Sequence, residues 1–328
     1  MKPQRLTIAN LPTRIEELTC FSEDFRQKLF VKRDDETGIE FSGNKVRKIE
    51  YAAKEALDQG ADTLITCGGI QSNHCRATAA VAARLGLKSI LLLRSDNRAF
   101  PQGNHLLDNL LGASIRWVTS GEYARERMQR MEKIKRNLES EGRKGYILPE
   151  GASNPIGTFG YFQAFEEILH QEKELNMTFD TIVCAVGSGG TYAGLVFGNE
   201  YHKSGKKIIG VNVCDDAEHF RDVVMSFHEP FCELLGETFS LSKEQLFILD
   251  GYVGRGYALN TPQEMDFLAT FAARSGIVLD PVYTNKTVYG LFDALKKGNP
   301  LFEESENILF IHTGGLYGVF PKAGEFNF

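Results

Sequence analysis

The sequence contains little of what marks a membrane-spanning or nucleic-acid-binding protein. Its 328 residues carry 37 Lys and Arg against 43 Asp and Glu, a formal net charge of −6. Because binding a nucleic-acid backbone requires a basic face, this charge argues against nucleic acid as a partner. No run of 18 apolar residues is present, since the uncharged stretch 181–199 is interrupted by "GSGG". That stretch favours a strand, a glycine turn and a helix over a membrane span, and we expect no membrane partner.

Closely spaced cysteines are also missing. The six cysteines stand at positions 20, 67, 75, 184, 214 and 232. This spacing fits neither a zinc site nor a redox pair, and a disulfide framework is unusual in so long a chain. The N-terminal residues 1–18 lack the apolar core of a signal peptide. We therefore expect reduced thiols, no metal site and a cytoplasmic location.

Apolar, strand-like runs alternate with helical patterns through most of the chain. In the first half, strands are predicted at 62–67, 89–94 and 114–119, and helices at 74–86, 103–112 and 121–142. In the second half, further strands are predicted at 180–186, 206–214 and 307–315. Such alternation predicts parallel sheets built from right-handed β-α-β units.

A segment with several glycines and prolines, 149–161, separates the two sets of strands. A length of 328 residues also fits about two domains. We expect an α/β fold of two open, twisted parallel-sheet domains, with the N-terminal segment joining the second sheet. The expected boundaries are a large domain of residues 1–50 plus 157–328 and a small α/β domain of residues 51–156.

The loop "GGIQSNHCRA" follows the predicted strand at 62–67. Ligands of open α/β sheets bind beyond the carboxyl ends of the strands. Ser72 or Asn73 can cap the following helix, whose free N–H groups favour a carboxylate or phosphate. The structural alternative is a plain N-cap, which needs only one capping residue. Here four polar residues stand side by side, which favours a functional loop; they are Gln71, Ser72, Asn73 and His74.

A second glycine loop, "GSGGTYAG" at 187–194, follows the predicted strand at 180–186. Its backbone amides can approach an anion closely, with Ser188 and Thr191 as hydroxyl donors. It is not the dinucleotide fingerprint, because Tyr192 stands where the last glycine is required. It is not a P-loop, because no G-K-[ST] follows. A glycine turn that packs a strand on a helix remains the structural alternative, and a third turn, at 313–318, is a weak signal by itself.

Cationic side chains are concentrated in "EFSGNKVRKIE", residues 40–50. On a helix, Lys45 and Lys48 would share one face while Arg47 points elsewhere. A solvated basic helix is the usual fate of such a run. If a phosphate lies at 187–191, however, a nearby amine is chemically expected, as an anion clamp or as a reactive lysine.

Two tyrosines stand among glycines and prolines. Tyr257 lies in "GYVGRGYAL" and Tyr283 in "DPVYTNKTVYG". Each could act as a general acid or as a packing residue with a polar tip. For either tyrosine taken alone, packing is the favoured interpretation.

Taken together and in order, several segments carry a recognisable pattern: "KRDDETGIEFSGNKVRKIEY", "GGIQSNHCRATAAVAARLGL", "VGSGGTYAG", "DPVYTNKTVYG" and "IHTGG". This pattern resembles the D-cysteine desulfhydrase and 1-aminocyclopropane-1-carboxylate (ACC) deaminase family of pyridoxal 5'-phosphate (PLP) enzymes, which have the tryptophan-synthase-β-like fold type II. The resemblance runs from about residue 7 to residue 318. It implies a PLP cofactor bound mainly by the large domain, a small amino acid as substrate, and a homodimer.

The resemblance also implies roles for individual residues. Lys45 matches the lysine that binds PLP covalently, and Asn73 is expected near the ring hydroxyl. Ser72 with neighbouring amides is expected to hold the substrate carboxylate, and Tyr257 and Tyr283 match two active-site tyrosines. The implied cofactor-binding set is Lys45, Lys48, Asn73, Gly187, Ser188, Gly189, Gly190, Thr191, Thr284 and Thr313. The implied substrate-binding set is Gln71, Ser72, Asn73 and His74.

Two departures separate the branches of this family. At the position of Thr284, ACC deaminases resemble "DPVYE", whose final carboxylate lies at the pyridine nitrogen. Where this chain has "QSNHC", ACC deaminases resemble "QSNQT". The corresponding group in this chain is a neutral hydroxyl, of Thr284 or Thr313, which stabilises a protonated pyridine ring less than a carboxylate does. The ring is then a weaker electron sink, which suits elimination of a good leaving group better than opening of a cyclopropane. We therefore expect β-elimination from D-cysteine to hydrogen sulfide, pyruvate and ammonia.

Other functions remain open at this stage. On the same scaffold they are ACC deamination to 2-oxobutyrate and ammonia, and a lyase or deaminase reaction on another small D-amino acid or a sulfonated amino acid. A cofactor-free anion-binding protein is an alternative of another class. A dinucleotide-dependent reductase is disfavoured by Tyr192.

Overall fold

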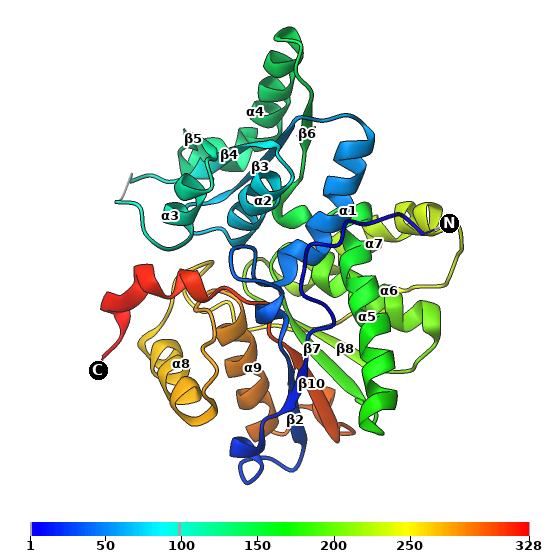
Figure 1. Cartoon of the computed structure of the whole chain (residues 1–328). Helices are drawn as coiled ribbons and strands as arrows, with labels where there is room; N and C mark the ends of the chain where they lie inside the picture. Colours follow the sequence, from blue (N-terminus) through cyan, green and yellow to red (C-terminus); the bar gives the residue numbers. More distant parts are fainter. Residues whose placement is uncertain (1, 98–99, 328) are drawn as a thin grey trace.

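The structure is a computed structural model that describes residues 2–97 and 100–327. Two sheets form its framework (Figure 1). In the six-stranded sheet β1 runs antiparallel to β2 and the other neighbouring strands are parallel. In spatial order this sheet contains β1 (Ile15–Glu17), β2 (Lys28–Lys32), β10 (Asn307–Ile311), β7 (Thr181–Val186), β8 (Lys207–Asn212) and β9 (Phe247–Leu249).

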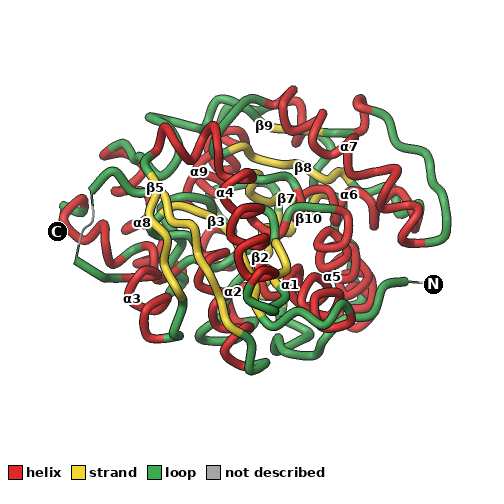
Figure 2. Tube along the Cα trace, turned by 90° about the horizontal axis from the view of Figure 1, so that it is seen from above, coloured by secondary structure: helices red, strands yellow, loops and turns green. Residues whose placement is uncertain are grey.

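The second sheet has four parallel strands. In spatial order they are β5 (Ser114–Val118), β4 (Lys88–Arg94), β3 (Thr63–Gly69) and β6 (Gly145–Ile147). Figure 2 shows the strands of both sheets as yellow segments among red helices. Strand β3 is buried along almost its whole length, as expected for a parallel strand covered on both faces.

Helices cover both faces of the six-stranded sheet, with α5 and α6 on one side and α8 and α9 on the other (Figure 1). The α-helices are α1 (Asn44–Asp58), α2 (Asn73–Arg84), α3 (Gly103–Leu110), α4 (Ser120–Ser140), α5 (Pro155–Leu175), α6 (Gly190–His202), α7 (Ala217–Leu235), α8 (Pro262–Ser275) and α9 (Thr284–Lys296). The short 3-10 helices are η1 (Thr19–Phe21), η2 (Asp34–Glu36), η3 (Glu150–Ala152), η4 (Lys243–Gln245), η5 (Pro300–Phe302), η6 (Leu316–Gly318) and η7 (Phe320–Glu325). None of the helices within the described ranges is both long enough and apolar enough to cross a bilayer.

The predicted α/β fold with two parallel sheets is confirmed. Every strand predicted from the apolar runs is present, and the N-terminal segment joins the six-stranded sheet, which holds the second set of predicted strands, through the parallel pairing of β2 with β10. The segment 149–161 leads from β6 of one sheet into α5, which precedes β7 of the other. The domain boundaries after residues 50 and 156 stay predictions, and they fall within α1 and the first turn of α5.

Helix α1 is not a solvated basic helix, so that alternative is wrong. The side chain of Arg47 is 1% exposed, and it forms a 2.8 Å ion pair with Asp34, whose side chain is 0% exposed. A second pair joins Arg47 to Glu167 at 3.0 Å. Burial raises the pKa of Asp34, but the attraction of Arg47 and Lys32 outweighs it and holds the pKa at about 2. These pairs fix the helix that carries Lys45.

Candidate active site

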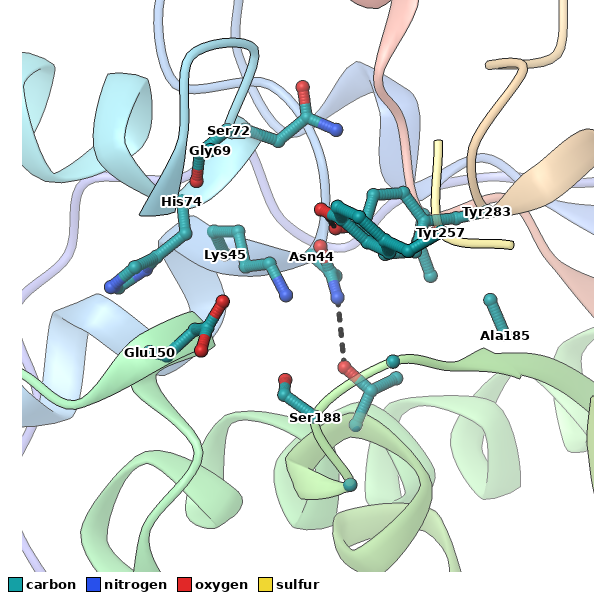
Figure 3. Close-up of a pocket in the computed structure, with 16 residues that line it drawn as sticks. Asn44, Lys45, Gly69, Ser72, His74, Glu150, Ala185, Ser188, Tyr257 and Tyr283 are labelled. Atoms are coloured by element: carbon teal, nitrogen blue, oxygen red, sulfur yellow. Dashed lines mark hydrogen bonds between the residues drawn. The ribbon is translucent and has the colours of Figure 1, made fainter. Parts of the chain in front are cut away.

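One pocket lies where the carboxyl ends of β3, β7 and β10 meet the start of α1 (Figure 3). This is the edge at which parallel sheets bind ligands. The pocket brings together most of the predicted site residues, although they come from distant parts of the chain. The lining residues are Asn44, Lys45, Gly69, Ser72, Asn73, His74, Glu150, Gly151, Ala185, Gly187, Ser188, Gly189, Thr191, Tyr257, Tyr283 and Thr313.

Lys45, the second residue of α1, points into this pocket (Figure 3). The start of the helix is held by a 3.1 Å hydrogen bond from the Asn44 N–H to the Thr313 carbonyl. Gly43 has φ of 105°, and a Cβ there would lie 2.5 Å from the same carbonyl oxygen, so only glycine permits this close approach. Burial lowers the pKa of the Lys45 amine to about 8, although Glu150 and Asp280 act to raise it. A substantial neutral fraction near pH 8 makes this amine a nucleophile.

The loop after β3 caps α2 as expected. The Ser72 hydroxyl accepts a 3.2 Å hydrogen bond from the Cys75 N–H. Burial, followed by the charges of Lys45 and Lys48, holds the pKa of His74 well below its ordinary value, so its ring is neutral. His74 Nε2 lies 2.7 Å from the Thr66 hydroxyl. Ser72, Asn73 and His74 all line the pocket.

Gln71, in contrast, is not among the lining residues. Its side chain accepts a 2.9 Å hydrogen bond from the Asn104 N–H and donates a 3.0 Å bond to the Gln102 carbonyl. The predicted substrate contact of Gln71 therefore has no support from the pocket geometry. Its side chain instead fixes the start of α3 against the loop after β3.

The glycine loop after β7 is shaped to receive an anion. Gly187, Ser188, Gly189 and Thr191 line the pocket, and Thr191 accepts a 2.9 Å hydrogen bond from the Asn44 side chain. Gly189 has φ of 82°, which suits glycine. Helix α6 starts at Gly190, whose N–H donates a 3.3 Å hydrogen bond to the Ser153 hydroxyl, and the N-terminal end of the helix at this loop favours negative charge.

Lys48 lies behind the same loop and is fully buried. Its amine donates a 2.8 Å hydrogen bond to the Ser153 hydroxyl, and a Cβ on Gly190 would lie 2.7 Å from its Nζ. Within the described ranges, no carboxylate stands within ion-pair distance of Lys48. Burial, followed by the charge of Lys45, lowers the pKa of Lys48 well below its ordinary value. A buried amine without a counter-charge beside an anion-binding loop fits the phosphate of a bound cofactor.

Tyr257 and Tyr283 meet at the pocket wall with their hydroxyl oxygens 2.5 Å apart. Burial is the largest cause that raises the pKa of Tyr257 to about 12 and that of Tyr283 well above its ordinary value. Both hydroxyls are therefore protonated and able to donate. This arrangement supports an active-site role over the packing role favoured for each tyrosine alone.

The two threonines proposed for the cofactor ring are placed differently. Thr313 lines the pocket. Thr284 is buried outside it, where its hydroxyl donates a 2.8 Å hydrogen bond to the Asp280 carboxylate and accepts a 2.7 Å bond from the Asp280 N–H. The geometry favours Thr313 for the pyridine nitrogen, and the assignment stays a prediction.

Several pocket residues were not found from the sequence. Glu150 and Gly151 of η3 lie in the segment interpreted only as a crossing between sheets, and Ser153 contacts both Lys48 and Ser188. The position of these residues after a strand was the one sequence signal that could have identified them. Since β6 is parallel to β3, its carboxyl end opens on the same edge, so the polar residues after it belong to the site.

A family model described as pyridoxal-phosphate dependent enzyme matches residues 6–314. The chain is 42% identical over 326 residues to a putative ACC deaminase of Thermotoga maritima, covering 97% of this chain and 98% of that one. It is 40% identical over 330 residues to a bifunctional D-cysteine desulfhydrase/ACC deaminase of Arabidopsis thaliana, covering 97% and 80%. It is 37% identical over 321 residues to a D-cysteine desulfhydrase of Yersinia enterocolitica, covering 96% and 95%.

Solved structures agree with this family. The crystal structure of a protein described as an ACC deaminase homologue matches with a TM-score of 0.90 and 37% identity, covering 99% of this chain and 95% of that one. The crystal structure of a threonine deaminase matches with a TM-score of 0.63 and 18% identity, covering 92% of each chain. That second likeness shows a shared fold alone.

Proposed function

The chain belongs to the pyridoxal-phosphate-dependent enzyme family, and from this premise we propose that it catalyses β-elimination from D-cysteine, giving hydrogen sulfide, pyruvate and ammonia. The observation that carries the proposal is the pocket itself. It combines an amine with a pKa near 8, a cradle for an anion and a pair of tyrosine hydroxyls. The relatives from Yersinia enterocolitica and Arabidopsis thaliana, whose names include D-cysteine desulfhydrase, support this substrate.

The residues present fit PLP as the cofactor. We propose that Lys45 holds it covalently, and that the 187–191 loop with Lys48 and Ser153 holds its phosphate. Thr313 and Asn73 would meet the ring. When bound, PLP stabilises negative charge at the α-carbon of an amino acid. The buried amine of Lys48, which lacks a carboxylate partner, would thus receive the phosphate of the predicted cofactor as its counter-charge.

The remaining steps belong to side chains of this chain. Ser72 and the free N–H groups at the start of α2 would bind the substrate carboxylate. Once the substrate amine has displaced it from the cofactor, the neutral amine of Lys45 would accept the α-proton. The hydroxyl pair of Tyr257 and Tyr283 would donate a proton to the departing sulfur. A thiol has a reference pKa of about 8.5, so this sulfur leaves with little assistance.

A second function, ACC deamination to 2-oxobutyrate and ammonia, is favoured by two findings. They are the 42% identity with a putative ACC deaminase of Thermotoga maritima and the TM-score of 0.90 with an ACC deaminase homologue. Against it stands Thr284, which offers no carboxylate at the position where ACC deaminases resemble "DPVYE". Another small D-amino acid or a sulfonated amino acid remains a further alternative on the same scaffold.

A substrate panel tests these proposals. The purified enzyme would be supplied with D-cysteine, L-cysteine and ACC, and sulfide, pyruvate, 2-oxobutyrate and ammonia would be measured. Sulfide and pyruvate in equal amounts from D-cysteine are expected. Formation of 2-oxobutyrate from ACC with no sulfide from either cysteine would instead establish the second function.

We further propose a homodimer in the cytoplasm. Large apolar side chains are exposed on α3, η6 and η7, where η6 contacts both of the others, as a buried interface would require. They are Leu106, Leu110, Leu316 and Phe320, and Ile39, whose carbonyl accepts a 3.2 Å hydrogen bond from Tyr317 of η6, is also exposed. All six cysteines carry free thiols, which a reducing compartment preserves.

A further inference from the structure

Glu150 brings an anionic side chain into the pocket at a place that the mechanism above does not use. It stands in η3, directly after the carboxyl end of β6, and its carboxylate points into the pocket toward Lys45 (Figure 3). Among the described lining residues, Glu150 is the one with an anionic side chain and Lys45 the one with a cationic side chain. When Lys45 is bound to the cofactor, Glu150 would therefore be the charged side chain left among these lining residues, while the Arg94 guanidinium lies behind the pocket wall, 5.7 Å from the centre of the Tyr257 ring.

The nearest cation does not neutralise this carboxylate. Arg127 Nε of α4 lies 3.7 Å from Glu150 Oε2, and the two side chains are 39% and 45% exposed. Such long, exposed pairs contribute little and leave the carboxylate free to act on other groups. The exposure also places part of the Glu150 side chain in contact with solvent, whereas Lys45 is buried.

The charge of Glu150 acts across the whole pocket. On one side it raises the pKa of the Lys45 amine against the lowering effect of burial. On the other side it adds to burial in raising the pKa values of Tyr257 and Tyr283. The space between Lys45 and the tyrosine pair is where the β-substituent of an amino acid must lie if the tyrosines assist its departure. A charged β-substituent would therefore experience the field of Glu150.

We propose that Glu150 determines substrate specificity by charge: it admits small amino acids with a neutral or cationic β-substituent and rejects those with an anionic one. This inference rests on the proposed function, in that the site accepts a small amino acid. It deepens that proposal, because the uncharged thiol of cysteine is accepted while a sulfonate or carboxylate in the same place is repelled. It thereby argues against sulfonated amino acids as substrates.

The test uses two amino acids of nearly equal shape that differ by one charge, aspartate and asparagine. They are supplied in the enantiomer of cysteine that the enzyme turns over, and their dissociation constants are measured by calorimetry on the PLP-loaded protein. In the wild type, asparagine is expected to bind about tenfold more tightly than aspartate, because the half-exposed carboxylate of Glu150 would repel a second carboxylate in the same pocket. In Glu150→Gln this ratio is expected to fall close to one.

Two further variants make the result specific. Glu150→Asp keeps the charge and is expected to retain most of the ratio. Glu126→Gln removes the same charge from an exposed pair with Arg130 on α4, outside the pocket, and is expected to leave the ratio unchanged. Thermal unfolding of each variant confirms that it is folded.

The outcomes separate this inference from the proposed function. An unchanged aspartate-to-asparagine ratio in folded Glu150→Gln would overturn the role of Glu150, whatever the enzyme does to D-cysteine. If neither enantiomer of cysteine is turned over, the dissociation constants are measured for both enantiomers of aspartate and asparagine. A fall of the aspartate-to-asparagine ratio close to one in Glu150→Gln would then support the role of Glu150 in specificity, although the proposed reaction would be refuted.

Discussion

The Lys48 amine donates a 2.8 Å hydrogen bond to the Ser153 hydroxyl, and Ser153 in turn lies 2.8 Å from the hydroxyl of Ser188 in the glycine loop. This chain of contacts joins α1, the segment after β6 and the loop after β7 at one point. It leaves the fully buried amine of Lys48, whose pKa is lowered by burial, facing that loop without a carboxylate partner in the described parts of the chain. The arrangement is costly in the free protein and favourable once an anion is bound.

Lys48→Met is therefore expected to act in opposite directions on the free and the loaded protein. Removing a buried, unpaired amine should raise the melting temperature of the PLP-free protein by a few degrees. The same change should weaken PLP binding at least about tenfold, because the counter-charge of the phosphate is lost. Thermal unfolding and PLP titration measure the two effects.

Lys54→Met is the matched control for this experiment. Lys54 lies on the same helix and pairs with Asp58 near the surface, at 25% and 60% exposure. Neither stability nor PLP affinity should change appreciably in this variant. An equal loss of PLP affinity in both variants would show that Lys48 is not the phosphate partner.

The reactivity of Lys45 should follow a pKa of about 8. Since only the neutral amine attacks an aldehyde, the rate of PLP capture by the free protein should rise with pH and level off above about 8, whereas an ordinary lysine would continue to gain up to about 10.5. The difference in rate between the wild type and Lys45→Met, followed by absorbance, isolates this amine. A midpoint near 10.5 would contradict the burial argument.

The lowered pKa of Lys45 should also make the folding stability of the PLP-free protein depend on pH. The folded-state pKa of Lys45 is lowered, so between pH 8 and the unfolded value near 10.5 the unfolded chain binds more protons than the folded one. The contribution of Lys45 to stability therefore increases as pH rises through this window and is unfavourable below it. The stability difference between Lys45→Met and the PLP-free wild type should accordingly shrink from pH 7 to pH 10.

The tyrosine pair should matter most for the poorer leaving group. Tyr257→Phe and Tyr283→Phe each keep a ring and remove one partner of the 2.5 Å hydrogen bond. At least one of them should lower kcat for D-cysteine about tenfold or more. With β-chloro-D-alanine, whose chloride needs no proton, the loss should be smaller. Equal losses on both substrates would assign the hydroxyls to binding rather than to proton donation.

The Arg47–Asp34 pair should contribute strongly to folding. Arg47→Met leaves the Asp34 carboxylate buried without its main partner, and such changes typically cost about 3–5 kcal/mol. Arg14→Met, which removes an exposed pair with Glu36, should cost less than about 1 kcal/mol. Denaturant unfolding compares the two variants, and similar small effects would refute a structural role for Arg47.

The amino-acid sequence predicted the two sheets because buried parallel strands are continuous apolar runs, such as 180–186, which stand out from their polar neighbours. It also predicted the loops at strand ends, since glycines and capping residues mark them locally. It did not predict that Gln71 turns toward α3, or that Thr284 bonds to Asp280 outside the pocket, because both depend on contacts that the local pattern does not reveal. Glu150 was missed for a similar reason, because its position follows from the pairing of β6 with β3.

Peptide mapping shows whether the Lys45 amine binds PLP covalently. The PLP-loaded protein is reduced with borohydride, digested and analysed by mass spectrometry. A single PLP-derived mass increase is expected on the peptide containing Lys45, and this increase should be absent from Lys45→Ala. A stable increase on Lys48 or on another lysine, with Lys45 unmodified, would contradict it.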